Sequence, residues 1–188
     1  MTVRDRFVVI VALGLAATLP AAAAPAFTLT SPDFAPNGRV AERFVLNAYG
    51  CSGGNISPTL EWHDAPAGTK SFAITLFDRD ERTTPSGWWH WVLYNLPPST
   101  SHLASGAGAE HSTALPAGAV QGRSDLGTDA YHGPCPEKGD PPHHYLFTIY
   151  ALSVDKLDVP PEASGAMVTS IAHDVTLGTA TFTGLYGR

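Results

Sequence analysis

Short apolar runs separated by Gly, Pro and Asn recur along most of this chain. In residues 143–152 (HHYLFTIYAL) the apolar side chains fall on alternate positions, as in a strand with one buried face. Residues 71–77 (SFAITLF) are apolar throughout, and 88–96 (WWHWVLYNL) follow after a polar loop. We therefore predict that 71–77 and 88–96 form a central pair of strands, with a polar pocket where their ends meet.

The rest of the pattern predicts an all-β sandwich with a little helix. Short β-type runs separated by turn residues, 18 Gly and 16 Pro in all, continue along the chain. No internal repeat divides the sequence, so we predict one domain over residues 27–188. The further predicted strands are 27–30, 39–49, 57–63 and 179–186, with a short polar strand or turn at 119–127.

The segments between these strands have their own signals. Residues 97–118 are rich in Ser, Ala and Gly and predict a long surface connection, and 128–142 predict an irregular Gly/Pro loop. Only 162–174 (EASGAMVTSIAHD) has helical spacing, and Pro160 lies at or before its start. We predict that Leu177 and Gly178 close this helix.

The first residues of the chain have the pattern of a secretory signal. Arg4 and Arg6 precede the apolar run 7–16, and small residues at 21–24 provide an A-x-A cleavage site. The apolar stretch is shorter than the roughly 20 residues that a membrane span needs. We therefore predict a signal peptide over residues 1–23, with cleavage after residue 26 as the alternative, and export to the periplasm or the medium.

The charge of the chain excludes some classes of partner. Removal of residues 1–23 takes away Arg4, Asp5 and Arg6, so the net charge changes from −6 to −7. No basic run is present, and nucleic-acid binding begins with the neutralisation of phosphates. No basic amphipathic helix is visible that could hold the protein on an anionic membrane. We predict neither a nucleic-acid partner nor a membrane span.

The two cysteines, Cys51 and Cys135, both lie in the part of the chain that would be exported. In an oxidising compartment such an even pair is expected to form a disulfide, worth about 4–5 kcal/mol in the chain-entropy model for so long a loop. A reactive thiol or a metal ligand is the alternative. The sequence has no C-x-x-C, and the cysteines are not grouped with histidines at zinc-site spacing.

Candidate chemistry surrounds the loop between the central strands. Asp78 and Asp80 would share a face if the strand continued through them, where one carboxylate could hold an imidazole in its tautomer. Aspartates also end strands by bonding to nearby backbone, and the spacing alone favours that role. His90 would share a face with Trp88 and Val92, although a single strand histidine is more often a core residue than a ligand.

A second histidine pair stands at the start of the run 143–152. His143 and His144 would point to opposite faces, with His143 on the face of Tyr145. If the strands of His90 and His143 were neighbours, their imidazoles, a phenol and a carboxylate could bind an oxyanion, or zinc through two histidines and an aspartate. Nothing in the local pattern shows whether they are neighbours.

Two longer motifs carry a resemblance to a known family. Residues 78–92 (DRDERTTPSGWWHWV) and 133–145 (GPCPEKGDPPHHY) resemble the two signatures of the phosphatidylethanolamine-binding proteins. The segments GGNISPTLEW, DAPAGTKSFAITLFD, LPAGAVQGRSDLG and ASGAMV are similar to the bacterial Raf-kinase-inhibitor-like branch of that family. The likeness begins near Phe27 and covers nearly the whole remaining chain, so it is more specific than any single motif.

The resemblance implies a Greek-key β-sandwich of two antiparallel sheets with a small anion-binding pocket at one end. It also implies that His90 and His143 converge, and that cysteines at the positions of Cys51 and Cys135 are bridged. Residues matching the ligand-binding positions of the family are Asp78, Asp80, Trp88, His90, Gly133, His143 and Tyr145.

The chain departs from the family pattern at two places near this pocket. Arg79 replaces a proline between the two aspartates, and the loop that follows is one residue longer. Arg79 restores a backbone N–H and frees φ, so the loop is expected to be less rigid. Glu137 replaces a proline beside the rim, where a carboxylate would repel phosphate and neighbouring Lys138 would offset the repulsion.

These observations predict an exported, non-enzymatic protein, monomeric or homodimeric, that binds a small anion such as phosphate or a phosphoethanolamine group without a metal or cofactor. In this interpretation His90, His143 and Tyr145 donate hydrogen bonds to the ligand. The alternative is an inhibitor or regulator of a protein partner, such as a protease, kinase or host protein. A hydrolase is a third option, but it lacks a nucleophile: Ser52 fits G-x-S-x-G, yet no helical pattern follows it.

Overall fold

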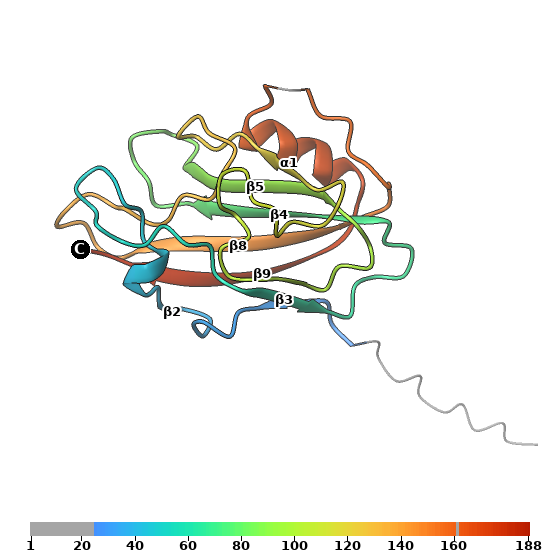
Figure 1. Ribbon diagram of the computed structural model, residues 1–188, viewed down its shortest axis with the longest axis horizontal. Coiled ribbons are helices and arrows are strands. Elements are labelled where there is room, and N and C mark those ends of the chain that lie inside the picture. The colour runs from blue at the N-terminus through green and yellow to red at the C-terminus, as the bar shows by residue number, and fades with distance from the viewer. Residues whose placement is uncertain (1–24, 161) are drawn as a thin grey trace, which may run out of the picture.

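The computed structural model describes residues 25–160 and 162–188, so the predicted signal peptide lies outside the described residues. No helix in the described ranges has the length and apolarity of a membrane span. The elements follow one another along the chain in the order shown in Figure 1. They are β1 (Thr28–Thr30), β2 (Gly38–Arg39), the 3₁₀ helix η1 (Glu42–Phe44), β3 (Leu60–His63), β4 (Ser71–Asp78), β5 (Trp88–Leu96), β6 (His102–Leu103), β7 (Val120–Gly122), β8 (His143–Leu152), α1 (Gly165–Asp174) and β9 (Thr176–Tyr186).

Two sheets form the body of the protein, as the sequence predicts. The larger has the order β2-β9-β8-β4-β5-β7, and the smaller has the order β1-β3-β6. All neighbouring strands are antiparallel except β2 and β9, which run parallel. Among the described strands, that two-residue pair is the exception to the antiparallel sheets that the resemblance implies. Strands β4, β5 and β8 meet at the centre, although β8 lies far along the chain from the other two.

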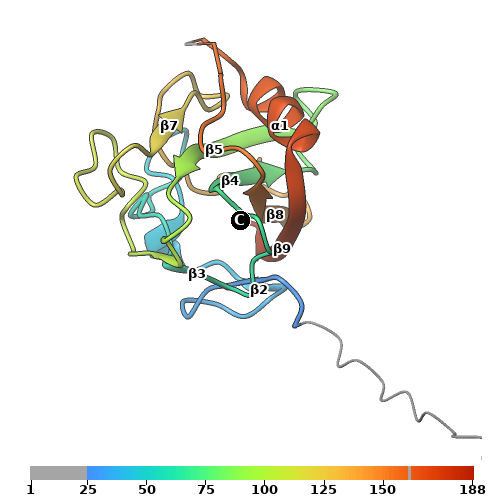
Figure 2. The ribbon, with the colours of Figure 1, turned by 90° about the vertical axis from the view of Figure 1, so that its right-hand side faces the viewer.

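The main core fills the space between the two sheets. Its largest members are aromatic, including Trp62, Trp91, Phe147 and Phe182. A second cluster lies on the other face of the large sheet, where Val92 and Tyr94 pack with residues of α1 and the segment before it. Figure 2 shows α1 over this outer face. The molecule therefore has three layers, with the large sheet in the middle.

The C-terminal helix is shorter than predicted. It begins at Gly165 because the Ser164 side chain accepts a hydrogen bond from Met167 N at 3.2 Å and caps the helix there. Gly165 packs tightly on an indole, since a Cβ at this position would lie 2.4 Å from Trp89 Cγ. The prediction that Leu177 and Gly178 close the helix is wrong, because β9 already begins at Thr176.

The predicted strand at 39–49 is also wrong. Apart from β2 and η1 this segment has no regular structure, and its apolar residues at 44–46 are consecutive rather than alternate. Its backbone bonds run to other loops: Leu46 N donates to Pro134 O, and Val45 O accepts from Asn55 N. The segment is thus a buried loop whose polar groups are satisfied outside any sheet.

Candidate functional site

The site lies where the C-terminal end of β4 meets the beginnings of β5 and β8. Asp78, the last residue of β4, is opposite Trp88 on β5 and Tyr145 on β8. Residues far apart in sequence therefore reach one edge of the sheet. They open into a cavity of about 350 Å³, within the usual range for small-molecule sites. Its lining residues are Leu46, Tyr49, Asp78, Glu81, Thr83, Trp88, His90, Leu126, Cys135, Glu137 and Tyr145.

A β-bulge places His90 in this cavity. Leu76 pairs with Trp91 and Phe77 with Trp89, so His90 is an extra residue on its strand. Trp88 and His90 both line the cavity, as predicted. The alternation beyond them is wrong, because the bulge puts Trp91 in the main core and Val92 on the helix-covered face.

His90 is held as an acceptor toward the cavity. Its Nδ1 lies 3.1 Å from His132 O, and because a carbonyl can only accept, Nδ1 carries the proton. Burial lowers the pKa of His90 to about 4, so the ring is neutral near pH 7. A neutral ring protonated at Nδ1 offers Nε2 as an acceptor, which differs from the donor role that the sequence predicts.

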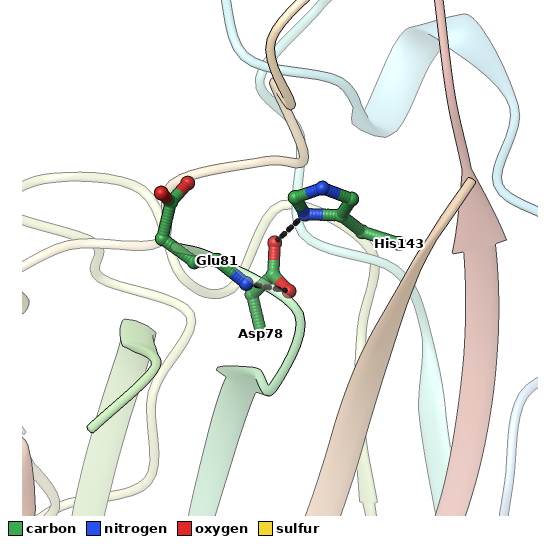
Figure 3. Close-up of side chains that lie close together, drawn as sticks. All are labelled: Asp78, Glu81 and His143. Carbon is green, nitrogen blue, oxygen red and sulfur yellow. Dashed lines mark hydrogen bonds and ion pairs between the residues drawn. The ribbon is translucent and has the colours of Figure 1, made fainter. Parts of the chain in front are cut away.

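Asp78, which lines the cavity, forms a buried pair with His143, which is not among the lining residues (Figure 3). His143 Nδ1 donates to Asp78 Oδ2 at 2.8 Å, and the two side chains are almost completely buried. Asp78 Oδ1 accepts from the backbone N–H groups of Asp80 and Glu81 at 2.9 and 3.2 Å. Asp78 therefore both orients the imidazole, as predicted, and fixes the start of the loop.

Asp80 does not line the cavity, although the sequence places it with Asp78 in one site. The strand ends at Asp78, so Asp80 turns toward His144 on the other side of β8. Its Oδ2 accepts from His144 N at 2.7 Å and lies 2.6 Å from His144 Nδ1. Burial raises the pKa of Asp80, but the bonds from His144 outweigh burial and hold it below the usual value.

Gly133 is not among the residues that line the cavity, although the sequence places it at the pocket. Its N–H donates to Asn55 Oδ1 at 2.9 Å. A Cβ at Gly133 would lie 2.0 Å from Phe44 O, so the close approach of two backbones requires glycine here. The preceding residue, His132, supplies the carbonyl that orients His90.

The outer lip of the cavity is held by a disulfide and an arginine. Cys51 and Cys135 are bonded, as predicted, and join two loops that are 84 residues apart. Arg188 spans the same loops, because its guanidinium donates to Gly50 O at 2.8 Å and to Pro136 O at 2.7 Å. The lip thus has a covalent and a hydrogen-bonded link.

The electrostatics of the cavity are acidic. Asp78, Glu81 and Glu137 contribute carboxylates, and no Lys or Arg is among the lining residues. Burial raises the pKa of Glu81, but hydrogen bonding to Thr83 outweighs it and keeps the pKa below the usual value. Tyr145, fully buried, has its pKa raised by burial and by the charge of Asp78.

Sequence reasoning missed several lining residues. Glu81 and Thr83 lie in the polar loop that the sequence marks as functional, so their position was the available signal. Leu46 and Tyr49 fell in a wrongly predicted strand, and Leu126 carries no local signal.

One ligand atom from each of Asp78, Glu81 and His143 lies within 4.8 Å of the other two. This set differs from the two histidines and aspartate that the sequence suggests as a zinc site. Figure 3 shows Asp78 between the loop that bears Glu81 and the strand that bears His143.

The fold is a β-sandwich of two sheets with a small cavity at the ends of its central strands. Comparison with known proteins identifies the family. Residues 30–187 match the phosphatidylethanolamine-binding protein family, and the chain belongs to it. It is similar to the UPF0098 protein YbcL of Escherichia coli, at 44% identity over 165 residues (88% of this chain and 90% of YbcL). The crystal structure of YbcL, described as a new member of the mammalian PEBP family, superposes with a TM-score of 0.83 at 42% identity, covering 86% of this chain and 98% of the YbcL structure.

Two other relatives extend the comparison. The E. coli UPF0098 protein YbhB is 44% identical over 158 residues, which are 84% of this chain and 98% of YbhB. A Mycobacterium tuberculosis protein described as putative lipoprotein LppC is 34% identical over 170 residues, covering 90% of this chain and 77% of LppC.

Proposed function

We propose that this protein binds a small phosphate-bearing headgroup that also carries an ammonium group, of the phosphoethanolamine type. The observation that carries the proposal is the composition of the cavity. A buried phenol, an aromatic wall and carboxylates surround a space of about 350 Å³. Donors and acceptors so arranged suit a ligand with both signs of charge better than free phosphate.

Tyr145 is the donor for the phosphate end. Its hydroxyl is buried and has no hydrogen-bond partner among the described residues. A buried hydroxyl without a partner is costly, so a ligand oxygen that accepts its proton would be stabilised. Since burial and the charge of Asp78 keep the pKa of Tyr145 high, the phenol retains its proton near pH 7.

The ammonium end has acceptors at the mouth of the same cavity. Glu137 is exposed at the rim, and Trp88 and Tyr49 contribute aromatic surface on which a cation can stack. His90 Nε2 is a further acceptor. In this arrangement Glu137, which would repel free phosphate, becomes a partner for the ligand.

We further propose that the protein is not an enzyme. The lining residues hold no free thiol, because Cys135 is engaged in the disulfide. Among the described residues, no histidine is hydrogen-bonded to the Thr83 hydroxyl to activate it. Ser52 lies exposed in a segment without helix or strand, which lacks the strand-turn-helix geometry of a nucleophile elbow.

Isothermal titration of the purified protein with O-phosphoethanolamine, phosphate and ethanolamine tests the ligand. We expect O-phosphoethanolamine to bind more tightly than either fragment. Tyr145→Phe removes only the hydroxyl and should weaken binding by about tenfold or more. Tyr94→Phe, the same change on the helix-covered face, is the matched control. Equal binding of free phosphate, or unchanged binding by Tyr145→Phe, would contradict the proposal.

Export is the second part of the proposed function. Three observations support it: the signal-like pattern of residues 1–23, the disulfide, and the likeness to a protein described as a putative lipoprotein. Intact mass measurement after expression in a bacterium, with fractionation of periplasm and cytoplasm, tests it. An uncleaved chain confined to the cytoplasm would refute it.

A further inference from the structure

We propose that Asp78, Glu81 and His143 bind one divalent transition-metal ion, with Zn²⁺ as the best-fitting probe. The three groups converge from two strands and a loop, and one ligand atom of each lies within 4.8 Å of the others. A metal about 2.1 Å from each ligand atom needs these atoms roughly 3.5 Å apart. Asp78 Oδ2 and His143 Nδ1 are 2.8 Å apart, so an ion that takes the place of the proton between them needs only a small separation of these two atoms. The half-buried Glu81 side chain supplies the third ligand atom.

Backbone bonds orient the two carboxylates, while the proton that His143 Nδ1 donates to Asp78 Oδ2 would have to leave for a metal to bind between them. Asp78 Oδ1 accepts from two backbone N–H groups, which fix the carboxylate plane. Glu81 Oε1 accepts from Thr83 N at 2.7 Å, which draws the loop around its carboxylate. Outer bonds of this kind orient first-shell ligands and raise affinity.

The buried Tyr145 hydroxyl, which lies close to the Asp78 carboxylate, also points to a ligand here. Tyr145 is fully buried and lines the same cavity as Asp78 and Glu81. Its Oη has no partner among the described residues. An oxygen on the metal, from water or from a bound phosphate, would accept its proton, so one ion accounts for both the carboxylates and the phenol.

The chemistry of the donor set selects the class of metal. One imidazole and two carboxylates suit Zn²⁺ and related ions, whereas Ca²⁺ and Mg²⁺ prefer oxygen alone. With three protein ligands, a fourth position would remain open toward the cavity, as in zinc sites that bind an exchangeable group.

This metal would supply the positive charge that the cavity lacks. Resting on the function proposed above, we infer that the phosphate oxygen of the headgroup binds to the metal beside Tyr145. Asp78 and Glu81 then attract the ligand through the metal instead of repelling its phosphate.

The test begins with untagged protein that has been treated with EDTA and exchanged into metal-free buffer. Titration with Zn²⁺ should give one ion per chain. Glu81→Gln keeps the size of the side chain and should weaken binding by at least about tenfold. Glu110→Gln removes the same charge from an exposed position outside this cavity and should leave Zn²⁺ binding nearly unchanged. Thermal unfolding of each variant without metal checks that it is folded.

Several results would overturn the site: no heat with Zn²⁺, unchanged affinity in Glu81→Gln, or an equal loss in both variants, which would indicate general electrostatics. Titration with O-phosphoethanolamine in Zn²⁺ and in EDTA then separates the two proposals. Tighter headgroup binding with Zn²⁺ supports direct binding of the phosphate oxygen to the metal. If O-phosphoethanolamine binds equally well in EDTA, the headgroup does not bind through the metal, but the proposed function stands. If Zn²⁺ binds and the headgroup does not, the metal site stands and the proposed function is wrong.

Discussion

The cavity has two walls that are held in place by different interactions. The strand wall consists of Asp78, Trp88, His90 and Tyr145, which stand at the ends of β4, β5 and β8. The loop wall consists of Leu46, Tyr49, Cys135 and Glu137, in segments without helix or strand.

The two walls differ in the interactions that fix the positions of their residues. In the strand wall, the register of the sheet fixes each residue through backbone bonds to its neighbours. In the loop wall, the disulfide, Arg188 and bonds between distant backbones perform that task. We therefore expect perturbations of the loop wall to change the lip while the strand wall keeps its geometry.

The largest expected effect comes from removing the disulfide. The double variant Cys51→Ala/Cys135→Ala should lower the free energy of unfolding by about 4–5 kcal/mol, because the bond closes a loop of 84 residues. Urea unfolding measures the loss, and reduced wild-type protein is the control. Amide hydrogen exchange should increase in the loop wall more than in β4 and β8. A uniform increase in both walls would remove the distinction between them.

A second prediction concerns the strand wall and acid. The pKa of His90 is about 4 in the folded protein and about 6.5 in the unfolded chain. Between these values the unfolded chain takes up a proton that the folded protein does not, so stability falls as the pH falls. The loss is complete near pH 4 and amounts to about 3 kcal/mol, while above pH 6.5 this histidine has no effect.

Urea unfolding of wild type and His90→Gln at pH 7 and pH 4 measures this contribution. The variant should lose about 3 kcal/mol less than wild type over that interval. Identical pH dependence in the two proteins would show that His90 is not held neutral by burial.

The smallest expected effect is at the C-terminal arginine. Arg188→Lys keeps the charge but cannot bridge Gly50 O and Pro136 O with one planar group. We expect a loss of about 1 kcal/mol and faster exchange at the lip. Arg39→Lys, on an exposed ion pair away from the cavity, is the control. An equal effect of both variants would mean that Arg188 does not hold the loops together.

The same contrast explains how much could be predicted from the sequence. Strands at 71–77, 88–96 and 143–152 carry strong β patterns, and they match β4, β5 and β8 to within one residue. Alternation also placed His143 beside Tyr145 and His144 opposite. The convergence of His90 and His143 came from the resemblance, since pairing between distant strands leaves no local trace. Their strands, β5 and β8, are not neighbours but lie on the two sides of β4.

The errors lie where local pattern and long-range contacts disagree. A bulge at His90 reverses the faces of Trp91 and Val92, and an inserted residue of this kind does not disturb the apolar pattern. Residues 39–49 look like a strand because they are apolar, yet their backbone partners are loops that the sequence does not place nearby. Glu81 became part of the site only through the fold of its loop around Asp78.

The Asp80–His144 contact makes the attachment of the loop independent of most of the residues in the loop. Asp78 and Asp80 fasten the beginning of the loop to β8, at His143 and His144, on the two sides of one strand. The fastening needs no proline between them, which accounts for the tolerance of Arg79. Residues 82–86 can consequently be exchanged or lengthened without moving the buried pair, whereas Gly87 is fixed by its φ of +76° and by its packing against Phe77 and Asp78 O. Natural relatives could therefore change ligand preference through this loop alone, while β4 and β8 keep their positions.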